Sequence, residues 1–305
     1  PLTFMTPFGF IPDFLEMMNM VSGGFLAQQG FAAKLLGGQG AVVTAQQLMT
    51  GAVSFVRLTA IDEFVAVAKG AAFVSVATLY QGSTFHVISP KDKPVNSAED
   101  FKGKTIGIVS VGGSTEQLLD IMLQSARMTK ADVTTQVVGN SPGAMQYLRQ
   151  GRIDCFIKSI GVVVALQTAN EPIAHWPTDR YAPMPSQIFV TTRETIEKKP
   201  AMVVGFLKAL KASTEDMLHG DLKTIFQRAN GDFDIPGMKN INEQVALMRF
   251  IMDGPWMSQG RENFLRNMPE LWAKAQKGIG GAGIASVPNV EALYTNTFIE
   301  QALKA

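Results

Sequence analysis

The chain has 305 residues, of which 46% are hydrophobic and 17% charged, and its formal net charge is +1. This composition is that of a globular protein, and the length exceeds what one small core usually supports, so we expect two lobes. The near-zero charge gives no reason to expect a nucleic-acid partner, which would normally show as a basic stripe. No apolar run of about 18 residues occurs, so we expect no membrane span in this chain.

The chain is poor in residues that bind metals or attack substrates. Its single cysteine, Cys155, excludes an internal disulfide, and it lies in an apolar run that predicts a buried, inert thiol. His86, His175 and His219 show no metal-ligand spacing. The glycine-rich stretch 278–283 lacks the preceding strand that a dinucleotide site needs, and we interpret it as a flexible interruption. We therefore expect no catalytic residue, metal or cofactor.

Short apolar runs, each followed by glycines and an amphipathic stretch, alternate along the first two thirds of the chain. This pattern indicates βαβ units and a largely parallel sheet. We expect strands over residues 2–6, 33–36, 54–58, 73–80, 105–109, 133–138, 153–157 and 188–192. We expect helices near residues 13–21 and 61–68, others that end at 49 and 151, one that begins near 114, and then 200–217, 221–229, 242–252, 261–277 and 290–302.

Two segments about a hundred residues apart share one pattern. Residues 48–56 and 148–156 both consist of a helix end, a glycine at Gly51 or Gly151, and a buried strand. Two lobes of similar plan explain the repeat. A chance repetition explains it as well, because glycine-capped turns between helix and strand are common.

In open α/β sheets, ligands bind outside the carboxyl ends of the strands, where the N–H groups of the following helices point outward. The helix entry Gly112–Thr115 is the most attractive such end, since glycines allow close approach and the helix dipole favours a negative group. Ser114 and Gln117 have capping-box spacing, so Ser114 can also serve only as a cap. Arg57 and Lys158 lie at the ends of the two repeated strands and would either neutralise an anion or reach to water at the rim.

An ordered set of short matches resembles a known family. The stretches are Gly23–Phe31, Leu35–Gly38, Ala98–Ile108, Leu148–Asp154 and Arg193–Pro200. In this order they resemble the NMT1/THI5-like and SsuA/TauA-like substrate-binding proteins over about the first 210 residues, although no single stretch is specific. Carried over to this sequence, the family's ligand loops and crossings fall on Phe8, Phe10, Gly38, Gln39, Arg57, Thr59, Gln81, Ser83, Gly113, Ser114, Thr115, Lys158 and Gln187.

The resemblance implies a two-lobed type II periplasmic-binding fold, each lobe a mostly parallel sheet flanked by helices, with the ligand cleft between the lobes. One lobe would comprise residues 1–82 and 190–305, and the other residues 83–189. The implied function is that of a solute-binding protein of an ABC importer. It would close about crossings near 81–83 and 186–188 on a small molecule and deliver it to the membrane permease. The ligand class does not carry over, because the opening loop and Arg57 depart from the family. From the Gly112–Thr115 helix entry, Arg57, Lys158 and the nearby aromatic residues we expect a small organic anion, a carboxylate or sulfonate with a planar or apolar body.

We expect a monomer outside the cytoplasmic membrane, in the periplasm or on the outer face of the cell membrane. This location is implied by the resemblance; the start at Pro1 without Met suits a processed or a trimmed protein and does not by itself indicate a location. Two alternatives stay open: a ligand-sensing domain, and an enzyme of the pyrimidine-precursor or menaquinone-pathway type on the same fold. The lone Cys155 argues against the cysteine-rich pyrimidine synthases. Asp62 and Glu63 are interpreted as partners of a helix N-terminus rather than as an acid–base pair.

Overall fold

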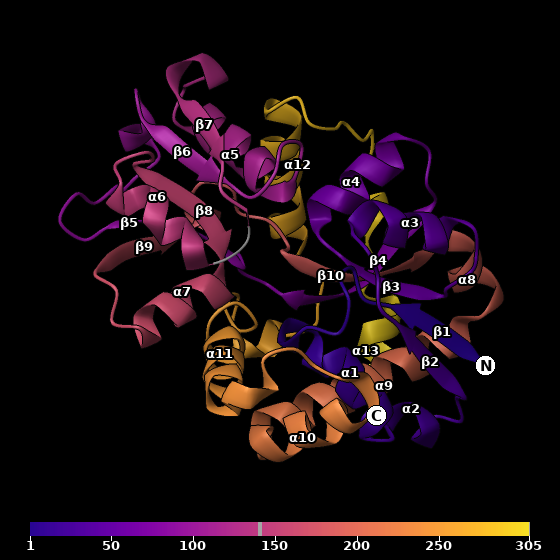
Figure 1. The fold of residues 1–305 in the computed structure, drawn as a ribbon. Coiled ribbons are helices and arrows are strands. Elements are labelled where there is room, and N and C mark those ends of the chain that lie inside the picture. Colours follow the sequence, from indigo (N-terminus) through magenta and orange to yellow (C-terminus); the bar gives the residue numbers. More distant parts are fainter. Residues whose placement is uncertain (140–141, 305) are drawn as a thin grey trace. The chain divides into compact units, whose positions relative to one another are not determined.

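In a computed structural model that describes residues 1–139 and 142–304, the chain forms two compact units (Figure 1). The first comprises Pro1–Gln81, Pro185–Trp272 and Val287–Ala305, and the second comprises Gly82–Met184 and Ala273–Ser286. The sequence assigned residues 185–189 to the second lobe and residues 82 and 273–286 to the first, whereas contacts group each of them with the other unit. The division of the chain into two lobes that bind the ligand stays a prediction.

The first unit contains a five-stranded sheet in the order β2-β1-β3-β10-β4. Its strands are β1 (Leu2–Met5), β2 (Ala33–Leu36), β3 (Phe55–Leu58), β4 (Phe73–Tyr80) and β10 (Gln187–Thr192). Strand β10 is antiparallel to both β3 and β4, so the other four strands run in one direction. The sheet is therefore mostly parallel, as its short apolar runs predict.

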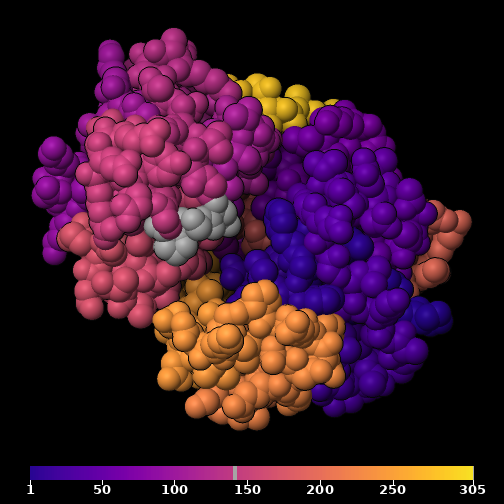
Figure 2. Space-filling model, viewed as in Figure 1, coloured from indigo at the N-terminus to yellow at the C-terminus, as the bar shows by residue number. Residues whose placement is uncertain are grey.

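The helices of the first unit surround this sheet. They are η1 (Pro12–Phe14), α1 (Leu15–Ser22), α2 (Phe25–Gln28), α3 (Ala41–Met49), α4 (Ala60–Ala68), α8 (Arg193–Lys198), α9 (Pro200–His219), α10 (Leu222–Phe233), η6 (Met238–Asn240), α11 (Ile241–Asp253), η7 (Arg261–Asn263), η8 (Val290–Leu293) and α13 (Thr297–Leu303). Phe206 of α9 stacks on Phe55 with ring centroids 4.0 Å apart and meets Phe4 edge-on. These buried aromatic contacts pack α9 against the sheet. The space-filling view shows α10 and α11, in orange, on the surface of this unit (Figure 2).

The second unit repeats the plan with a sheet in the order β7-β6-β8-β5-β9. Its strands are β5 (Phe85–Pro90), β6 (Thr105–Ile108), β7 (Thr134–Val137), β8 (Cys155–Ser159) and β9 (Ile173–Pro177). Its helices are η2 (Glu99–Phe101), α5 (Ser114–Ser125), η3 (Lys130–Asp132), η4 (Pro142–Ala144), α6 (Met145–Arg149), α7 (Ile160–Thr168) and η5 (Thr178–Arg180). Leu148 of α6 and Val163 of α7 share one apolar cluster with Ile88 and Phe156 of the sheet.

The repeat detected in the sequence corresponds to a repeat in the fold. Gly51 and Gly151 both have positive φ, +74° and +64°, which a residue with a side chain rarely adopts. The chain then enters β3 or β8, and each of these strands lies beside the first parallel strand of its own sheet. The two sheets also share one strand order, in which the fourth position is taken by the antiparallel strand. Two units of similar plan therefore account for the repeat.

Four sequence predictions about elements were incomplete or wrong. Strands β5 and β9 and helix α7 were not predicted at all. The predicted helix 261–277 is broken: η7 ends at Asn263, and α12 (Pro269–Gly281) begins at a proline, which suits a first helical turn. The glycines at 278–281 do not interrupt α12. A Cβ on Gly278 would lie 3.1 Å from Ile121 of α5, so these glycines allow close packing of α12 on α5. The predicted helix 290–302 is likewise split, into η8 and α13.

Candidate functional site

Each sheet contains one point where the chain reverses its direction of travel across the strands. In the first unit, β1 leads to β2 on one side, and the chain then returns past β1 to β3. In the second unit, β6 leads to β7, and the chain returns past β6 to β8. Ligands of open α/β sheets bind at such switch points, outside the carboxyl ends of the strands. The loops after β1 and β3, and those after β6 and β8, are therefore the candidate site in each unit.

In the first unit, the loops after β1 and β2 are joined by hydrogen bonds around Thr6. The Thr6 hydroxyl donates to the Gly9 carbonyl at 2.6 Å and accepts from the Gly38 N–H at 3.3 Å. A Cβ on Gly38 would lie 2.2 Å from the Thr6 carbonyl oxygen, so only glycine fits there. Phe8 forms a β-bridge with Gln39. The predicted loop residues are thus brought together by the fold.

The side chains of these two loops differ in exposure. Phe8 is 54% exposed and Gln39 is exposed as well, so both are accessible to a solute. Phe10 is partly buried, with its ring 5.0 Å from that of Phe233 in α10. Phe8 therefore has the surface expected of a ligand-contacting aromatic, whereas Phe10 has a packing partner within its own unit.

Arg57, predicted as an anion-binding residue, is buried and has partners inside the first unit. Its Nη1 lies 2.5 Å from Glu16 Oε1 and donates to the Asp13 carbonyl at 2.7 Å, and its Nε donates to Gln187 Oε1 at 3.1 Å. Its guanidinium lies over the rings of Phe14 and Tyr80, 4.7 and 4.6 Å from their centroids. The positive charge is thus neutralised by Glu16. Contact of Arg57 and Gln187 with a ligand stays a prediction.

Glu16 is the residue at this site that the sequence analysis missed. It is fully buried in the first turn of α1, where burial raises the pKa of its carboxyl while the Arg57 charge opposes that shift. Its second oxygen, Oε2, has no hydrogen-bond partner among the described residues. Because Glu16 and Arg57 are 41 positions apart, no short motif could have paired them.

Thr59 is the N-cap of α4. Its hydroxyl accepts from the Asp62 N–H at 3.2 Å, and Asp62 in turn accepts from the Thr59 N–H at 3.0 Å. This reciprocal capping box confirms the interpretation of Asp62 as a partner of the helix N-terminus. Glu63, by contrast, is fully buried, and its desolvation raises its pKa well above the usual value.

Gln81 and Ser83, which belong to different units, are both held by hydrogen bonds inside their own unit. The Gln81 side-chain amide donates to the carbonyls of Asn263 and Arg266, at 2.9 Å each. The Ser83 hydroxyl lies 2.7 Å from that of Thr178. These contacts fix the two residues locally, and their contact with a ligand stays a prediction.

In the second unit, α5 begins at Ser114 with Gly113 as its N-cap. The predicted Ser114–Gln117 capping box is therefore wrong: Ser114 is already the first helical residue, so its hydroxyl is not placed to cap. The N–H groups of Ser114 and Thr115 donate to no described residue. The Thr115 hydroxyl instead accepts from the Val109 N–H at 2.9 Å. Free N–H groups at a helix N-terminus favour an anion.

Glu116 lies close to this N-terminus and competes with an anion there. Its carboxylate accepts a hydrogen bond from the Gly112 N–H. The same carboxylate is 3.6 Å from Lys130 Nζ, which balances part of its charge. The Glu116 carboxylate therefore already occupies the Gly112 N–H at this helix N-terminus. An anion bound here would need a further positive group nearby to offset the negative charge of Glu116.

Lys158, near the end of β8, supplies a buried positive group to the second unit. Its side chain is fully buried, and Nζ has no hydrogen-bond partner among the described residues. Burial lowers the pKa of Lys158 to about 8, so the amine is still mainly protonated at neutral pH. An unpartnered buried ammonium is costly to maintain, and an anion placed beside it would remove that cost. Among the predicted residues, Lys158 is the one whose surroundings point most directly to a ligand.

The structure confirms the prediction that Cys155 is buried. The thiol is buried, and burial raises its pKa, which leaves it in the unreactive protonated form. Among the described residues, no group of three or more His, Cys, Asp or Glu side chains is arranged to hold a metal ion. No described helix is both long enough and apolar enough to cross a membrane.

One motif was overlooked in the sequence: residues 139–143 have the Gly-x-Ser-x-Gly spacing of a nucleophile elbow. Its serine, Ser141, lies outside the described residues. The described part of this unit shows no acid–histidine pair that such a serine would need. His86 and His175 contact each other, and the second contact of His175 is with Gln167, not with a carboxylate.

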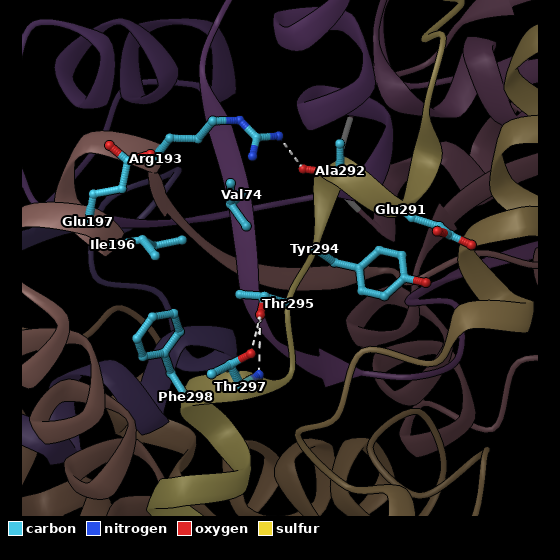
Figure 3. Close-up of a pocket in the computed structure, with 10 residues that line it drawn as sticks. All are labelled: Val74, Arg193, Ile196, Glu197, Glu291, Ala292, Tyr294, Thr295, Thr297 and Phe298. Atoms are coloured by element: carbon cyan, nitrogen blue, oxygen red, sulfur yellow. Dashed lines mark hydrogen bonds between the residues drawn. The ribbon is translucent and has the colours of Figure 1, made fainter.

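A pocket of about 290 Å³ lies elsewhere in the first unit, at the edge of β4 (Figure 3). Arg193 spans it and donates to the Ala292 carbonyl, and Tyr294 and Phe298 contribute aromatic walls. Val74, near the start of β4, forms its floor, so the pocket lies at the opposite end of the sheet from the switch point. None of the predicted ligand residues lines it.

Comparison with known proteins places the chain in a family. The sequence profile described as "NMT1/THI5 like" matches residues 12–220. The riboflavin-binding protein RibY of Chloroflexus aurantiacus is 23% identical over 265 residues, which cover 82% of this chain and 71% of RibY.

Several solved structures share the fold, among them a binding protein and an enzyme. The periplasmic aliphatic sulphonate binding protein SsuA of Escherichia coli superposes with a TM-score of 0.73 at 14% identity, over 96% of this chain and 91% of SsuA. The desulfurization enzyme DszB superposes with a TM-score of 0.62 at 14% identity, over 100% of this chain and 99% of DszB. The fold is therefore the type II periplasmic-binding fold, and the chain belongs to the NMT1/THI5-like family.

Proposed function

We propose that this chain is the solute-binding protein of an ABC importer, that it works outside the cytoplasmic membrane, and that it binds a small molecule with a carboxylate or sulfonate group. The observation that carries the proposal is Lys158, whose buried ammonium has no partner among the described residues. The free N–H groups of Ser114 and Thr115 follow the neighbouring strand β6 and add donors suited to an anion. Phe8, exposed at the switch point of the first unit, supports an apolar or planar ligand body.

The relatives support a small-molecule ligand without naming it. One is named for riboflavin and one for aliphatic sulphonates. A sulfonate has the anionic group that we infer from Lys158. Riboflavin has the planar ring system but no such anionic group. Closure of the two lobes on a shared ligand, expected from the sequence resemblance, stays a prediction.

The ligand class is tested by thermal shift and calorimetry with benzenesulfonate, benzoate, riboflavin and glucose. We expect the two anions to raise the melting temperature, since a ligand at 100 times its Kd stabilises the protein by about 2.7 kcal/mol. Lys158→Met should abolish that shift, while Lys102→Met, which removes an exposed lysine of the same unit, should leave it unchanged. Stabilisation by glucose alone would refute the proposal, and stabilisation by riboflavin alone would replace the anion with a neutral heterocycle.

The enzymatic alternative is tested on the same samples, because DszB shows that this fold also supports catalysis. The proposal expects every bound probe to be recovered unchanged after prolonged incubation, as judged by mass spectrometry. A product that forms only when the protein is present, and that disappears in Ser141→Ala, would assign the chain to the enzymes.

A further inference from the structure

His86 lies directly opposite Lys158 in the second sheet. The two residues are register partners of the antiparallel strands β5 and β8, so their side chains project from the same face of the sheet. His86 is almost wholly buried, with 6% of its surface exposed, and its register partner Lys158 has an ammonium without a partner among the described residues. A second polar side chain therefore adjoins the residue on which the proposed function rests.

The hydrogen bonds of His86 determine which ring nitrogen holds its proton. Gln167 of α7 places its amide nitrogen, a donor, 3.1 Å from His175 Nε2, so that nitrogen accepts. The proton of neutral His175 is then on Nδ1, which lies 3.0 Å from His86 Nδ1 and donates to it. His86 accepts at Nδ1 and consequently carries its own proton on Nε2. That Nε2–H donates to no described residue.

The surroundings keep this pair neutral. Burial, assisted by the neighbouring His175, lowers the pKa of His86 to about 3, and burial lowers the pKa of His175 as well. Lys158 faces His86 from β8, and helix α7, which contributes Gln167, contains no charged residue. Asp179 of η5 is engaged by the Ser83 N–H. No described carboxylate therefore competes for the His86 N–H.

We propose that His86 is a second ligand-recognising residue, whose Nε2–H donates to the anionic group that Lys158 attracts, and that His175 and Gln167 are positioning residues that hold His86 in this tautomer. The inference rests on the proposed function and deepens it. It gives the anion site one charged and one neutral donor from adjacent strands. A sulfonate or carboxylate, with two or more acceptor oxygens, can use both.

The tautomer is tested without any ligand by nitrogen-15 NMR of the histidine rings in the whole protein at pH 7. We expect His86 protonated at Nε2 and His175 protonated at Nδ1. In His175→Gln, which removes the ring that orients His86, the His86 signal should move toward a mixture of tautomers. His219→Gln, in the first unit, is the matched control and should leave the His86 signal in place. Protonation of His86 at Nδ1 in the wild type would overturn the proposal.

The binding role is tested by calorimetry with benzenesulfonate. His86→Phe, which keeps the ring and removes the donor, should weaken binding about ten- to a hundredfold, the loss expected for a hydrogen bond to a charged group. His219→Gln should bind as the wild type does. Normal binding by a folded His86→Phe would overturn the inference while leaving the proposed function intact. Absence of binding by the wild type would overturn both the inference and the proposed anion site.

Discussion

The guanidinium of Arg57 and the carboxylate of Glu16 form a buried ion pair, with Nη1 and Oε1 2.5 Å apart and both side chains almost wholly excluded from solvent. The pair joins β3 to the first turn of α1 at the switch point of the first unit. Removal of one member leaves the other charge buried and unpaired, which is far more costly than removal of both. Arg57 therefore acts first as a structural residue of this site.

Substitution of one member of this pair should be strongly destabilising. Arg57→Met should lower the free energy of unfolding by about 3–5 kcal/mol, because Glu16 is left without its counter-charge. The double variant Arg57→Met/Glu16→Leu should lose less than the sum of the two single variants. Urea unfolding measures all three, with the exposed Lys34→Met as control. A midpoint for Arg57→Met equal to that of the wild type would contradict this account.

Lys158 should be unfavourable for stability in the absence of ligand. Its folded-state pKa, about 8, lies below the usual value of 10.5, so the folded protein disfavours the charged form. The penalty is complete below pH 8 and disappears as the pH rises toward 10.5. Lys158→Met should therefore stabilise the protein by about 1–3 kcal/mol at pH 7, with a gain that shrinks above pH 8. Urea midpoints between pH 6.5 and 9.5 measure the trend, and a constant gain would argue against a buried ammonium.

Glu63 should make stability fall as the pH rises. Burial raises its folded-state pKa well above 4.5, so the folded protein favours the protonated carboxyl. The contribution of Glu63 to the stability of the folded protein is fully present below pH 4.5. It is lost as the pH rises through the raised pKa. Glu63→Gln should be more stable than the wild type at pH 7 by about 1–3 kcal/mol and equal to it near pH 4. The exposed Glu197→Gln serves as the control, and its midpoint should not change.

Replacement by alanine should affect stability differently at Thr59 and Ser114, which lie at the starts of two helices. Thr59→Ala removes the capping box of α4 and should cost about 1 kcal/mol of stability. Ser114→Ala should cost almost nothing, because Gly113 and not Ser114 is the N-cap of α5. Thermal unfolding of the two variants side by side is sufficient. A larger loss in Ser114→Ala than in Thr59→Ala would show that Ser114 supports α5 in another way.

Two glycine positions offer a matched comparison. A Cβ on Gly38 would lie 2.2 Å from the Thr6 carbonyl, so Gly38→Ala must displace the loop and should cost about 1–3 kcal/mol. Gly231, inside α10, has no atom within 4 Å of an added Cβ. Gly231→Ala should instead stabilise the protein by about 0.4–1 kcal/mol. Equal midpoints in chemical unfolding would refute the close approach of the loops after β1 and β2.

The sequence by itself determined the alternation of strands and helices, the repeat of two units, and the loops in which the candidate site lies. These features depend on local patterns: apolar runs of strand length, and glycines such as Gly51 and Gly151 at positions of positive φ. The ordered family matches, which add up over many short stretches, also indicated the fold. Local patterns suffice wherever neighbouring residues decide the conformation.

Only the tertiary structure decided the chemistry of each predicted residue. Arg57 is neutralised by Glu16, 41 positions away, whereas Lys158 has no partner among the described residues, although both lie near the ends of equivalent strands. Strand register placed His86 beside Lys158, 72 positions apart in the sequence. Glycines at 278–281 allow α12 to pack on α5 instead of interrupting a helix. In each case the outcome depends on which distant side chain lies alongside, and that is set by the packing of whole elements.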